Sequence, residues 1–244
     1  MIAIQTKALT KRYKDRLAVN ALDLSIEQGE FFALLGVNGA GKTTTIKMLS
    51  CLTRPTSGDA LLLGDSVLSK PDAVKKKINI SPQETAVAGN LSVKENLELV
   101  AGIYGSDAKT AQSKTNEMLS TFGLSEIAQH KAKTISGGMQ RRLSIAMALI
   151  SHPQILFLDE PTLGLDVFAR RELWSAIEKL KGEITIILTT HYMEEAEALS
   201  DRIGIMTRGR LQDVGTSAEL IAKTGTKTFE DAFIALASES EVDR

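Results

Sequence analysis

Residues 31–49 read FFALLGVNGAGKTTTIKML, and this stretch decides the fold. Its first five residues are apolar without interruption, which is typical of a strand covered on both faces in a parallel sheet. The pattern G-x-x-x-x-G-K-[ST] follows at once, with its fixed positions at Gly36, Gly41, Lys42 and Thr43. A strand, a glycine-rich loop and a helix in this order predict a phosphate-binding loop within an α/β core.

This loop has the composition that a nucleoside triphosphate requires. Glycines let backbone N–H groups curl around phosphate oxygens because no Cβ obstructs them, and the following helix adds the positive end of its dipole. We expect Lys42 to reach the β- and γ-phosphates and the Thr43 hydroxyl to hold Mg²⁺. A flexible glycine loop without a ligand is the alternative, and it does not explain the strand and the helix on its two sides. The residues predicted to bind nucleotide here are Gly36, Val37, Asn38, Gly39, Ala40, Gly41, Lys42, Thr43 and Thr44.

Two carboxylates follow a second apolar run. Residues 155–158 are Ile, Leu, Phe and Leu, and Asp159 and Glu160 come next. The carboxyl ends of parallel strands border the crevice where ligands bind in such sheets. We therefore expect Asp159 to serve the metal ion and Glu160 to polarise an attacking water. Alone, this pattern would indicate a solvated strand end, but the phosphate loop in the same chain favours the catalytic interpretation.

A second candidate for anion binding lies at residues 135–142, which read ISGGMQRR. Ser136, Gly137 and Gly138 stand at the expected start of an apolar helix, so a hydroxyl and backbone N–H groups would face outward. The chain therefore has two helix ends suited to phosphate.

The remaining sequence alternates between strands and helices, apart from one helical stretch. Residues 18–27 alternate apolar and polar side chains, which predicts one half-buried strand. Residues from about 86 to 152 have a helical pattern, and Ser92 with Glu95 forms a capping box. The other expected helices are 41–51, 109–122, 167–181, 193–199 and a tail helix from Thr228, and the other expected strands are 60–63, 184–188 and 203–206.

The bulk composition excludes several classes of protein. The formal net charge is −1, with 29 basic and 30 acidic residues, so no nucleic-acid partner is expected. Cys51 is the single cysteine, which excludes an internal disulfide and favours a reduced, cytosolic setting. Residues 1–7 lack the apolar core of a secretion signal, and no stretch approaches the ~20 apolar residues that span a bilayer. We therefore expect any work at a membrane to need a membrane-embedded partner.

The order of the phosphate loop, Gln83, the Ser-Gly-Gly motif, the Asp159-Glu160 pair and His191 resembles that of the ATP-binding-cassette (ABC) ATPases. The resemblance extends from Tyr13 to at least His191, and the Ser-Gly-Gly motif is specific to that family. It implies an α/β fold in which a phosphate-loop NTPase core with a mostly parallel sheet carries an N-terminal antiparallel β subdomain and an inserted helical subdomain. The implied organisation is a single domain over 1–244, with a core of about 1–85 and 153–220, a helical insert of about 86–152 and a short C-terminal helix of about 227–238.

The resemblance also implies roles for individual residues. Tyr13 matches the aromatic residue that stacks on adenine, the alternative being an ordinary tyrosine on a strand surface. Gln83 matches the glutamine that links the metal ion and the attacking water to the helical insert. His191 matches the histidine that senses the γ-phosphate, and Asp166 lies in the loop that touches a partner subunit. The implied sets are Lys42, Glu160 and His191 for catalysis, Thr43, Gln83 and Asp159 for the metal ion, and Tyr13, Gln83, Ser136, Gly137, Gly138 and Asp166 for ATP in addition to the phosphate loop.

The Ser-Gly-Gly motif departs from the usual form of the family. The signature commonly begins with Leu and has Gln in fifth place, where this chain has Ile135 and Met139. The form Gly-Gly-Met-x-Arg-Arg resembles the branch that serves exporters of drugs, sodium, polysaccharides or lipids. That branch implies separate transmembrane permease subunits, a second copy of this chain in an ATP-sandwich dimer, ATP and Mg²⁺ as ligands, and a cytoplasmic location on the inner face of the cell membrane.

Three other functions stay open as alternatives. ABC ATPases that act on ribosomes or DNA usually have two cassettes with a charged linker, or a long inserted coiled coil, and neither is present in 244 residues. Importer ATPases often add a regulatory domain, whereas little follows residue 215 except a short helix. A cassette that binds ATP without hydrolysing it is disfavoured because Lys42, Glu160 and His191 are all present.

Overall fold

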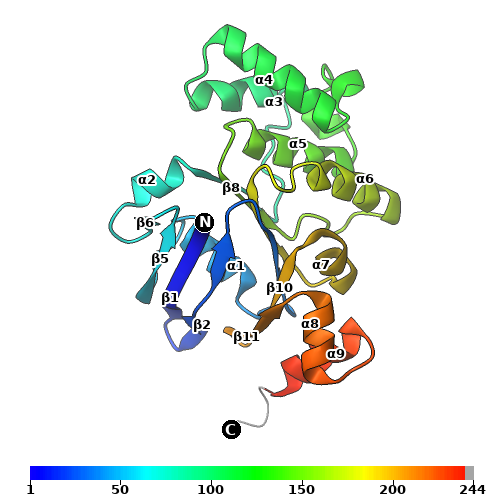
Figure 1. The fold of residues 1–244 in the computed structure, drawn as a ribbon. Coiled ribbons are helices and arrows are strands. Elements are labelled where there is room, and N and C mark those ends of the chain that lie inside the picture. The colour runs from blue at the N-terminus through cyan, green and yellow to red at the C-terminus, as the bar shows by residue number, and fades with distance from the viewer. Residues whose placement is uncertain (240–244) are drawn as a thin grey trace.

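The computed structural model describes residues 1–239 and contains two sheets (Figure 1). The larger sheet has six strands in the order β11-β10-β4-β9-β8-β7. All neighbours in it are parallel except β10 and β11, which confirms the mostly parallel core. Its strands are β4 (Phe31–Leu35), β7 (Ile78–Ser81), β8 (Ile155–Asp159), β9 (Thr185–Thr190), β10 (Arg202–Thr207) and β11 (Arg210–Gly215).

The second sheet is antiparallel and is formed mainly by the N-terminal part of the chain. The single strand expected over 18–27 is wrong, because the structure divides it into β2 and β3, which both pair with β1. Between these two strands the chain leaves the sheet at Asp23. The Oδ1 of Asp23 accepts a hydrogen bond of 2.7 Å from the backbone N–H of Ala8. The strands are β1 (Ile2–Tyr13), β2 (Arg16–Leu22), β3 (Ser25–Glu27), β5 (Ser57–Leu62) and β6 (Asp65–Ser66).

Three helices form a helical subdomain at one end of the molecule, where Figure 1 draws them in green. They are α3 (Val93–Ile103), α4 (Ala108–Thr121) and α5 (Gly137–Leu149), with short 3-10 turns at Ser125–Ile127 and Ala132–Thr134. The capping box at the start of α3 is confirmed. The backbone N–H of Ser92 donates to Glu95 Oε2 at 2.6 Å, and that of Glu95 donates to Ser92 Oγ at 3.1 Å. The proposed limits of the insert, about 86 and 152, stay a prediction.

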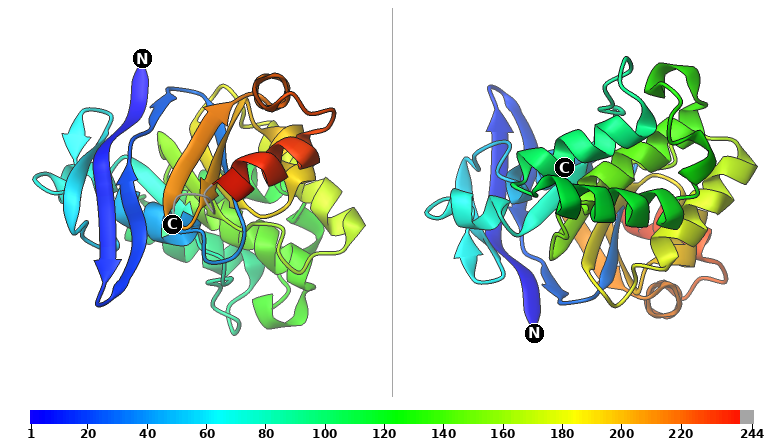
Figure 2. Two further views of the ribbon diagram at one scale, coloured as in Figure 1. Left: turned by 90° about the horizontal axis from the view of Figure 1, so that it is seen from below. Right: turned by 90° about the horizontal axis from the view of Figure 1, so that it is seen from above.

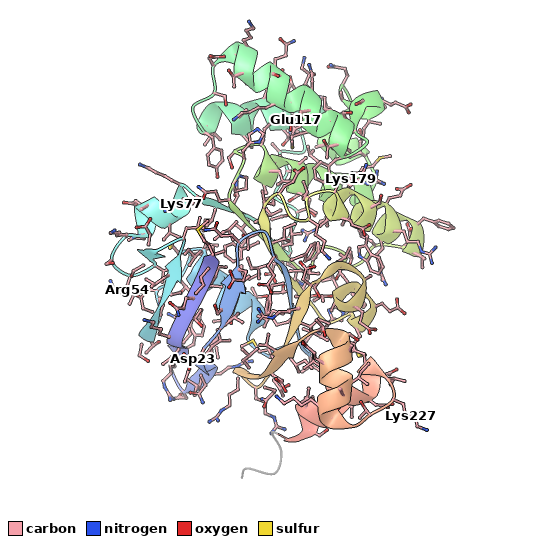
Figure 3. All side chains as sticks on the ribbon, in the orientation of Figure 1. Asp23, Arg54, Lys77, Glu117, Lys179 and Lys227 are labelled. Atoms are coloured by element: carbon pink, nitrogen blue, oxygen red, sulfur yellow. The ribbon has the colours of Figure 1, made fainter. Side chains whose placement is uncertain are left out.

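The hydrophobic core lies on both faces of the parallel sheet, because successive side chains of β4 point to opposite sides. Phe31 and Leu35 pack with the helices of the helical subdomain and of the C-terminal half. Phe32 and Leu34 pack with α1 (Lys42–Leu49) in the space between the two sheets. Figure 2 shows the antiparallel sheet on one side of this arrangement and the helical subdomain on the other, and Figure 3 shows side chains filling the interior. The uninterrupted apolar run of residues 31–35 therefore does mark a strand covered on both faces.

The C-terminal half differs from expectation in three elements. The helix expected over 167–181 is shorter, because the backbone N–H of Leu180 bonds to Ile177 in a tighter turn. The remaining helices are α2 (Pro71–Lys75), α6 (Val167–Glu178), α7 (Met193–Leu199), α8 (Ser217–Thr224) and α9 (Phe229–Glu239). The sequence does not predict strand β11 or helix α8, whereas it does predict α7 and the tail helix α9. Over residues 1–239, the helices are all too short or too polar to cross a bilayer.

Candidate functional site

The phosphate loop joins β4 to α1, and its shape depends on two glycines. A Cβ on Gly36 would lie 2.3 Å from the backbone oxygen of Met206, and one on Gly41 would lie 2.5 Å from that of Ala18. Gly41 also has a φ of 108°, which side chains rarely allow. Within residues 1–239, no side chain caps the start of α1. The first N–H groups of this helix are therefore available to an anion.

A cavity of about 440 Å³ opens above this loop and brings together parts of the chain that are far apart in sequence. It is bordered by the tip of the β1–β2 hairpin, the phosphate loop, the loop after β7 and the ends of β8 and β9. These strand ends meet because β9 lies between β4 and β8 in the sheet. The lining residues are Tyr13, Arg16, Ala18, Asn38, Gly39, Ala40, Gly41, Lys42, Thr43, Thr44, Gln83, Glu160, Leu163 and His191.

Lys42, Glu160 and His191 form a chain of charged and polar groups, and the first two are buried. Lys42 is 5% exposed and Glu160 is 6% exposed. Lys42 Nζ lies 3.1 Å from Glu160 Oε1, and it also donates to the backbone oxygens of Gly36 at 2.6 Å and Val37 at 3.3 Å. Glu160 Oε2 lies 2.7 Å from His191 Nδ1. The three residues predicted to be catalytic are thus in direct contact.

The backbone of Glu160 holds its carboxylate at the cavity. Its φ is 47°, a left-handed conformation that costs a residue with a Cβ on the order of 1 kcal/mol. The backbone N–H of Glu160 donates to Thr189, to its backbone oxygen at 3.1 Å and to its Oγ1 at 3.2 Å. The neighbouring strand β9 therefore stabilises this turn.

Asp159 lies just behind the cavity and contacts the phosphate loop. Its Oδ1 accepts hydrogen bonds from Thr43 Oγ1 at 3.1 Å and from Thr189 Oγ1 at 2.5 Å. Carboxylate and hydroxyl oxygens are the ligands that Mg²⁺ prefers. Among the described residues, no group of three His, Cys, Asp or Glu side chains could hold a metal ion by itself. Asp159 and Thr43 therefore fit a magnesium site in which phosphate oxygens and water supply the other ligands.

The Ser-Gly-Gly motif lies outside this cavity. Ser136 caps α5 by accepting a hydrogen bond of 3.3 Å from the backbone N–H of Met139. Ser136 and Gly137 are exposed, and a Cβ on Gly137 would meet open space. Asp166 likewise caps α6, through the backbone N–H groups of Phe168 and Ala169, both at 2.9 Å. In the part of the chain that the structure describes, the predicted residues that do not line the cavity are Gly36, Val37, Ser136, Gly137, Gly138, Asp159 and Asp166.

Three residues with clear contacts at the site were not predicted. Arg16 lines the cavity, and its Nη2 donates to the backbone oxygen of Gly39 at 3.4 Å. It pairs with Tyr13 across the hairpin, so recognition of that hairpin would have indicated it. Thr189 Oγ1 bonds to the Asp159 carboxylate and to the backbone N–H of Glu160. Arg141 donates to the backbone oxygens of Asp159 and Pro161, on either side of Glu160. No local signal in the sequence indicates these last two roles.

Comparison with known proteins identifies the family. The sequence model of the ABC transporter family matches residues 19–163, which is more than half of the chain. The daunorubicin/doxorubicin resistance ATP-binding protein DrrA of Streptomyces peucetius is 39% identical over 243 residues, covering 99% of this chain and 74% of that protein. The probable multidrug ABC transporter ATP-binding protein YbhF of Escherichia coli strain K12 is 40% identical over 240 residues, covering 96% of this chain and 41% of that protein.

A solved structure agrees with these matches. The dimeric ATP-binding cassette MJ0796, in a post-hydrolysis state bound to ADP and Pi, superposes with a TM-score of 0.79 at 28% identity, covering 87% of this chain and 98% of that chain. The cavity, the phosphate loop and these similarities lead to one conclusion: the chain belongs to the ABC transporter family, as an ATP-binding and ATP-hydrolysing cassette.

Proposed function

We propose that this chain powers a membrane exporter, and that two copies close head to tail around two ATP molecules. One observation carries the proposal: the chain has two helix ends suited to binding phosphate, and they do not meet within one copy. The loop at α1 borders the cavity, whereas Ser136 and Gly137 at the start of α5 are exposed on another part of the surface. A second copy would bring its Ser136 to the γ-phosphate held by the first copy. The dimeric state of the MJ0796 cassette supports this arrangement.

The proposed roles in ATP binding follow from positions in the cavity or beside it. Tyr13 at the hairpin tip would stack on adenine, and the backbone of residues 38–44 would hold the phosphates. Thr43, Asp159 and Gln83 would hold Mg²⁺, which neutralises charge on the phosphate oxygens when it is bound. Asp166 would contact the second copy through the exposed loop before α6.

The proposed chemistry uses the contacts of Glu160. A phosphate bound in the loop would draw Lys42 Nζ away from Glu160 Oε1, now 3.1 Å away, and so free this carboxylate oxygen. Glu160 would then accept a proton from the attacking water as the new bond to the γ-phosphorus forms. The bond from that phosphorus to the bridging oxygen breaks, which gives ADP and inorganic phosphate. The Nδ1 of His191 lies 2.7 Å from Glu160 Oε2, and this contact would hold the imidazole ring where it can also contact the γ-phosphate.

The proposed direction of transport is supported by the names of two relatives. DrrA is a drug-resistance ATP-binding protein, and YbhF is a probable multidrug transporter protein. By analogy, this chain would bind separate permease subunits at the inner face of the cell membrane. We expect a tagged chain, expressed in its native host, to co-purify from membranes with a polypeptide that has several apolar spans of ~20 residues. Recovery of the tagged chain without such a polypeptide, although it hydrolyses ATP, would argue against the transporter role.

The shared site makes a separate prediction. Gly137→Asp puts a carboxylate where a backbone N–H group would approach the γ-phosphate of the other copy. A like charge at roughly 8 Å, with an effective dielectric constant near 20, costs on the order of 2 kcal/mol, so we expect hydrolysis to fall about 30-fold. ATP binding to the monomer should be unchanged, because Gly137 lies outside the cavity of its own chain.

The control for this variant is Gly102→Asp, which adds the same charge at another exposed glycine with open space around it. Mixing Gly137→Asp with Lys42→Ala chains gives mixed dimers in which one site has both changes and the other has neither. With equal amounts and independent sites, about a quarter of the parent activity should return. A fully active Gly137→Asp protein would exclude the shared site.

A further inference from the structure

Arg141 is a buried cation that joins the helical subdomain to the ends of two strands. It lies in the second turn of α5, three residues after the Ser-Gly-Gly motif, and it is 4% exposed. Its Nε donates to the backbone oxygen of Pro161 at 2.8 Å, and its Nη2 donates to that of Asp159 at 2.9 Å. Its Nη1 donates to the backbone oxygen of Gln83 at 3.3 Å and also to that of Pro82.

These four carbonyl groups belong to two loops that are neighbours in space. Pro82 and Gln83 follow β7, and Asp159 and Pro161 flank the turn after β8, the strand beside β7. A planar guanidinium with five donors can bind all four carbonyls at once, whereas a lysine ammonium has only three donors at one point. Arg141 therefore fixes the distance between the two loops, and fixes both loops relative to α5.

The charge of Arg141 persists although it is buried. Burial lowers its pKa to about 10, and the charges of Asp159 and Glu195 act in the opposite direction. At neutral pH the side chain is a cation with charge-assisted hydrogen bonds, which are stronger than neutral ones. Its removal would leave several buried carbonyl oxygens without a donor.

We propose that Arg141 is a positioning residue for hydrolysis, which holds Gln83 and the Asp159–Glu160 turn at a set distance from the helix that carries Ser136. This inference rests on the proposed function, since Gln83 and Asp159 are the residues expected to hold Mg²⁺. Gln83 lines the cavity and Asp159 contacts Thr43, so a shift of either loop changes the metal site. The same side chain ties the site of one copy to the Ser-Gly-Gly motif that this copy offers to the other.

Arg141→Met removes the guanidinium and retains most of the length and apolar volume of the side chain. Loss of a group that orients metal ligands typically costs 10–100-fold in metal affinity or activity. We expect kcat to fall by about that factor and the Mg²⁺ concentration for half-maximal activity to rise about tenfold. The affinity for a fluorescent ATP analogue in EDTA should stay within about twofold of the parent, because Tyr13 and the phosphate loop keep their contacts. Arg141→Lys should recover only part of kcat.

A second measurement does not depend on turnover. ATP in EDTA should raise the melting temperature of Arg141→Met as much as that of the parent. The additional rise on replacing EDTA with Mg²⁺ should be reduced in the variant, because ligands stabilise the state that binds them according to their affinity.

The matched control is Asn96→Ala, which separates positioning from folding. Asn96 in α3 is 0% exposed, and its side chain bonds to the backbone of Ala88 and Ser92 within the helical subdomain. It does not line the cavity. We expect Asn96→Ala to lower the melting temperature while kcat and the Mg²⁺ dependence stay unchanged.

Two results would overturn the role of Arg141. In the first, Arg141→Met and Asn96→Ala have the same kcat and the same dependence of activity on Mg²⁺ concentration, at a temperature where both are folded. In the second, Arg141→Met loses ATP affinity by the same factor with Mg²⁺ and without it. If Arg141→Met does not fold, Arg141→Lys serves for the same comparison. Failure of the proposed exporter role would be distinguishable, because the tagged chain would then lack a membrane partner while the parent protein kept its Mg²⁺-dependent hydrolysis for comparison with Arg141→Met.

Discussion

Replacing Lys42 with alanine is expected to lower ATP hydrolysis by about 10²–10³-fold, the range seen when a single donor to developing negative charge is removed from a buried site. Lys42 Nζ is held over the phosphate loop by the backbone oxygens of Gly36 and Val37. The side chain is almost fully buried, so its charge acts on the phosphates through a medium of low dielectric constant. ATP affinity should also fall, since the same charge faces the β- and γ-phosphates. Phosphate release and binding of a fluorescent ATP analogue measure the two effects.

The same substitution has a cost in stability that must be measured separately. Lys42 and Glu160 form a buried ion pair, and removal of one partner from such a pair typically costs ~3–5 kcal/mol. Thermal denaturation of Lys42→Ala should therefore show a lower melting temperature. The control is Lys47→Ala, which removes an exposed lysine from the last turn of the same helix. Ordinary ATPase activity in folded Lys42→Ala would exclude Lys42 from the phosphate site.

The elements that could be predicted from sequence are those whose causes are local. The apolar run of β4, the glycines after it and the start of α1 adjoin one another, and the structure keeps that order. The capping box at Ser92 is likewise local, and α3 begins where it indicates. Helix α8 has the same signal at Thr216 and Glu219, so it too could have been predicted.

Other elements depend on contacts that the sequence does not display. The break between β2 and β3 interrupts a continuous alternation of apolar and polar residues, and it depends on Asp23 accepting a hydrogen bond from another strand. Strand β11 has few apolar residues, and it is an edge strand held by pairing with β10. In both cases the partner segment decides the structure of the backbone.

The candidate site also contains residues of both kinds, those with local signals in the sequence and those that depend on distant contacts. Gln83, Glu160 and His191 stand next to recognisable motifs, and the structure brings all three to one cavity. Thr189 and Arg141 act through hydrogen bonds to residues far away in the chain, and neither belongs to a pattern whose chemistry is evident in sequence.

Glu160→Gln separates ATP binding from ATP hydrolysis. The amide keeps the size of the side chain and can still accept a hydrogen bond from Lys42, but it cannot take a proton from water. Because general-base catalysis typically contributes 10²–10⁴-fold, we expect kcat to fall by about that factor. ATP affinity should be retained or increased, since a neutral side chain no longer competes with phosphate for Lys42. ATP would then persist between two copies, and size-exclusion chromatography with ATP and Mg²⁺ should show a stable dimer.

Glu195→Gln is the matched control, because it neutralises a second buried carboxylate, four residues after His191 in the chain, that does not line the cavity. Burial raises the pKa of Glu195, and hydrogen bonds from Thr190, Trp174 and Thr162 act in the opposite direction. Its Oε1 accepts a hydrogen bond of 3.0 Å from Trp174 Nε1, which the amide oxygen of glutamine can also accept. We therefore expect Glu195→Gln to hydrolyse ATP as the parent does and to remain monomeric on the same column. If Glu160→Gln behaved like Glu195→Gln, Glu160 would not be the base, and the proton of the attacking water would have to pass to another group, such as the γ-phosphate itself.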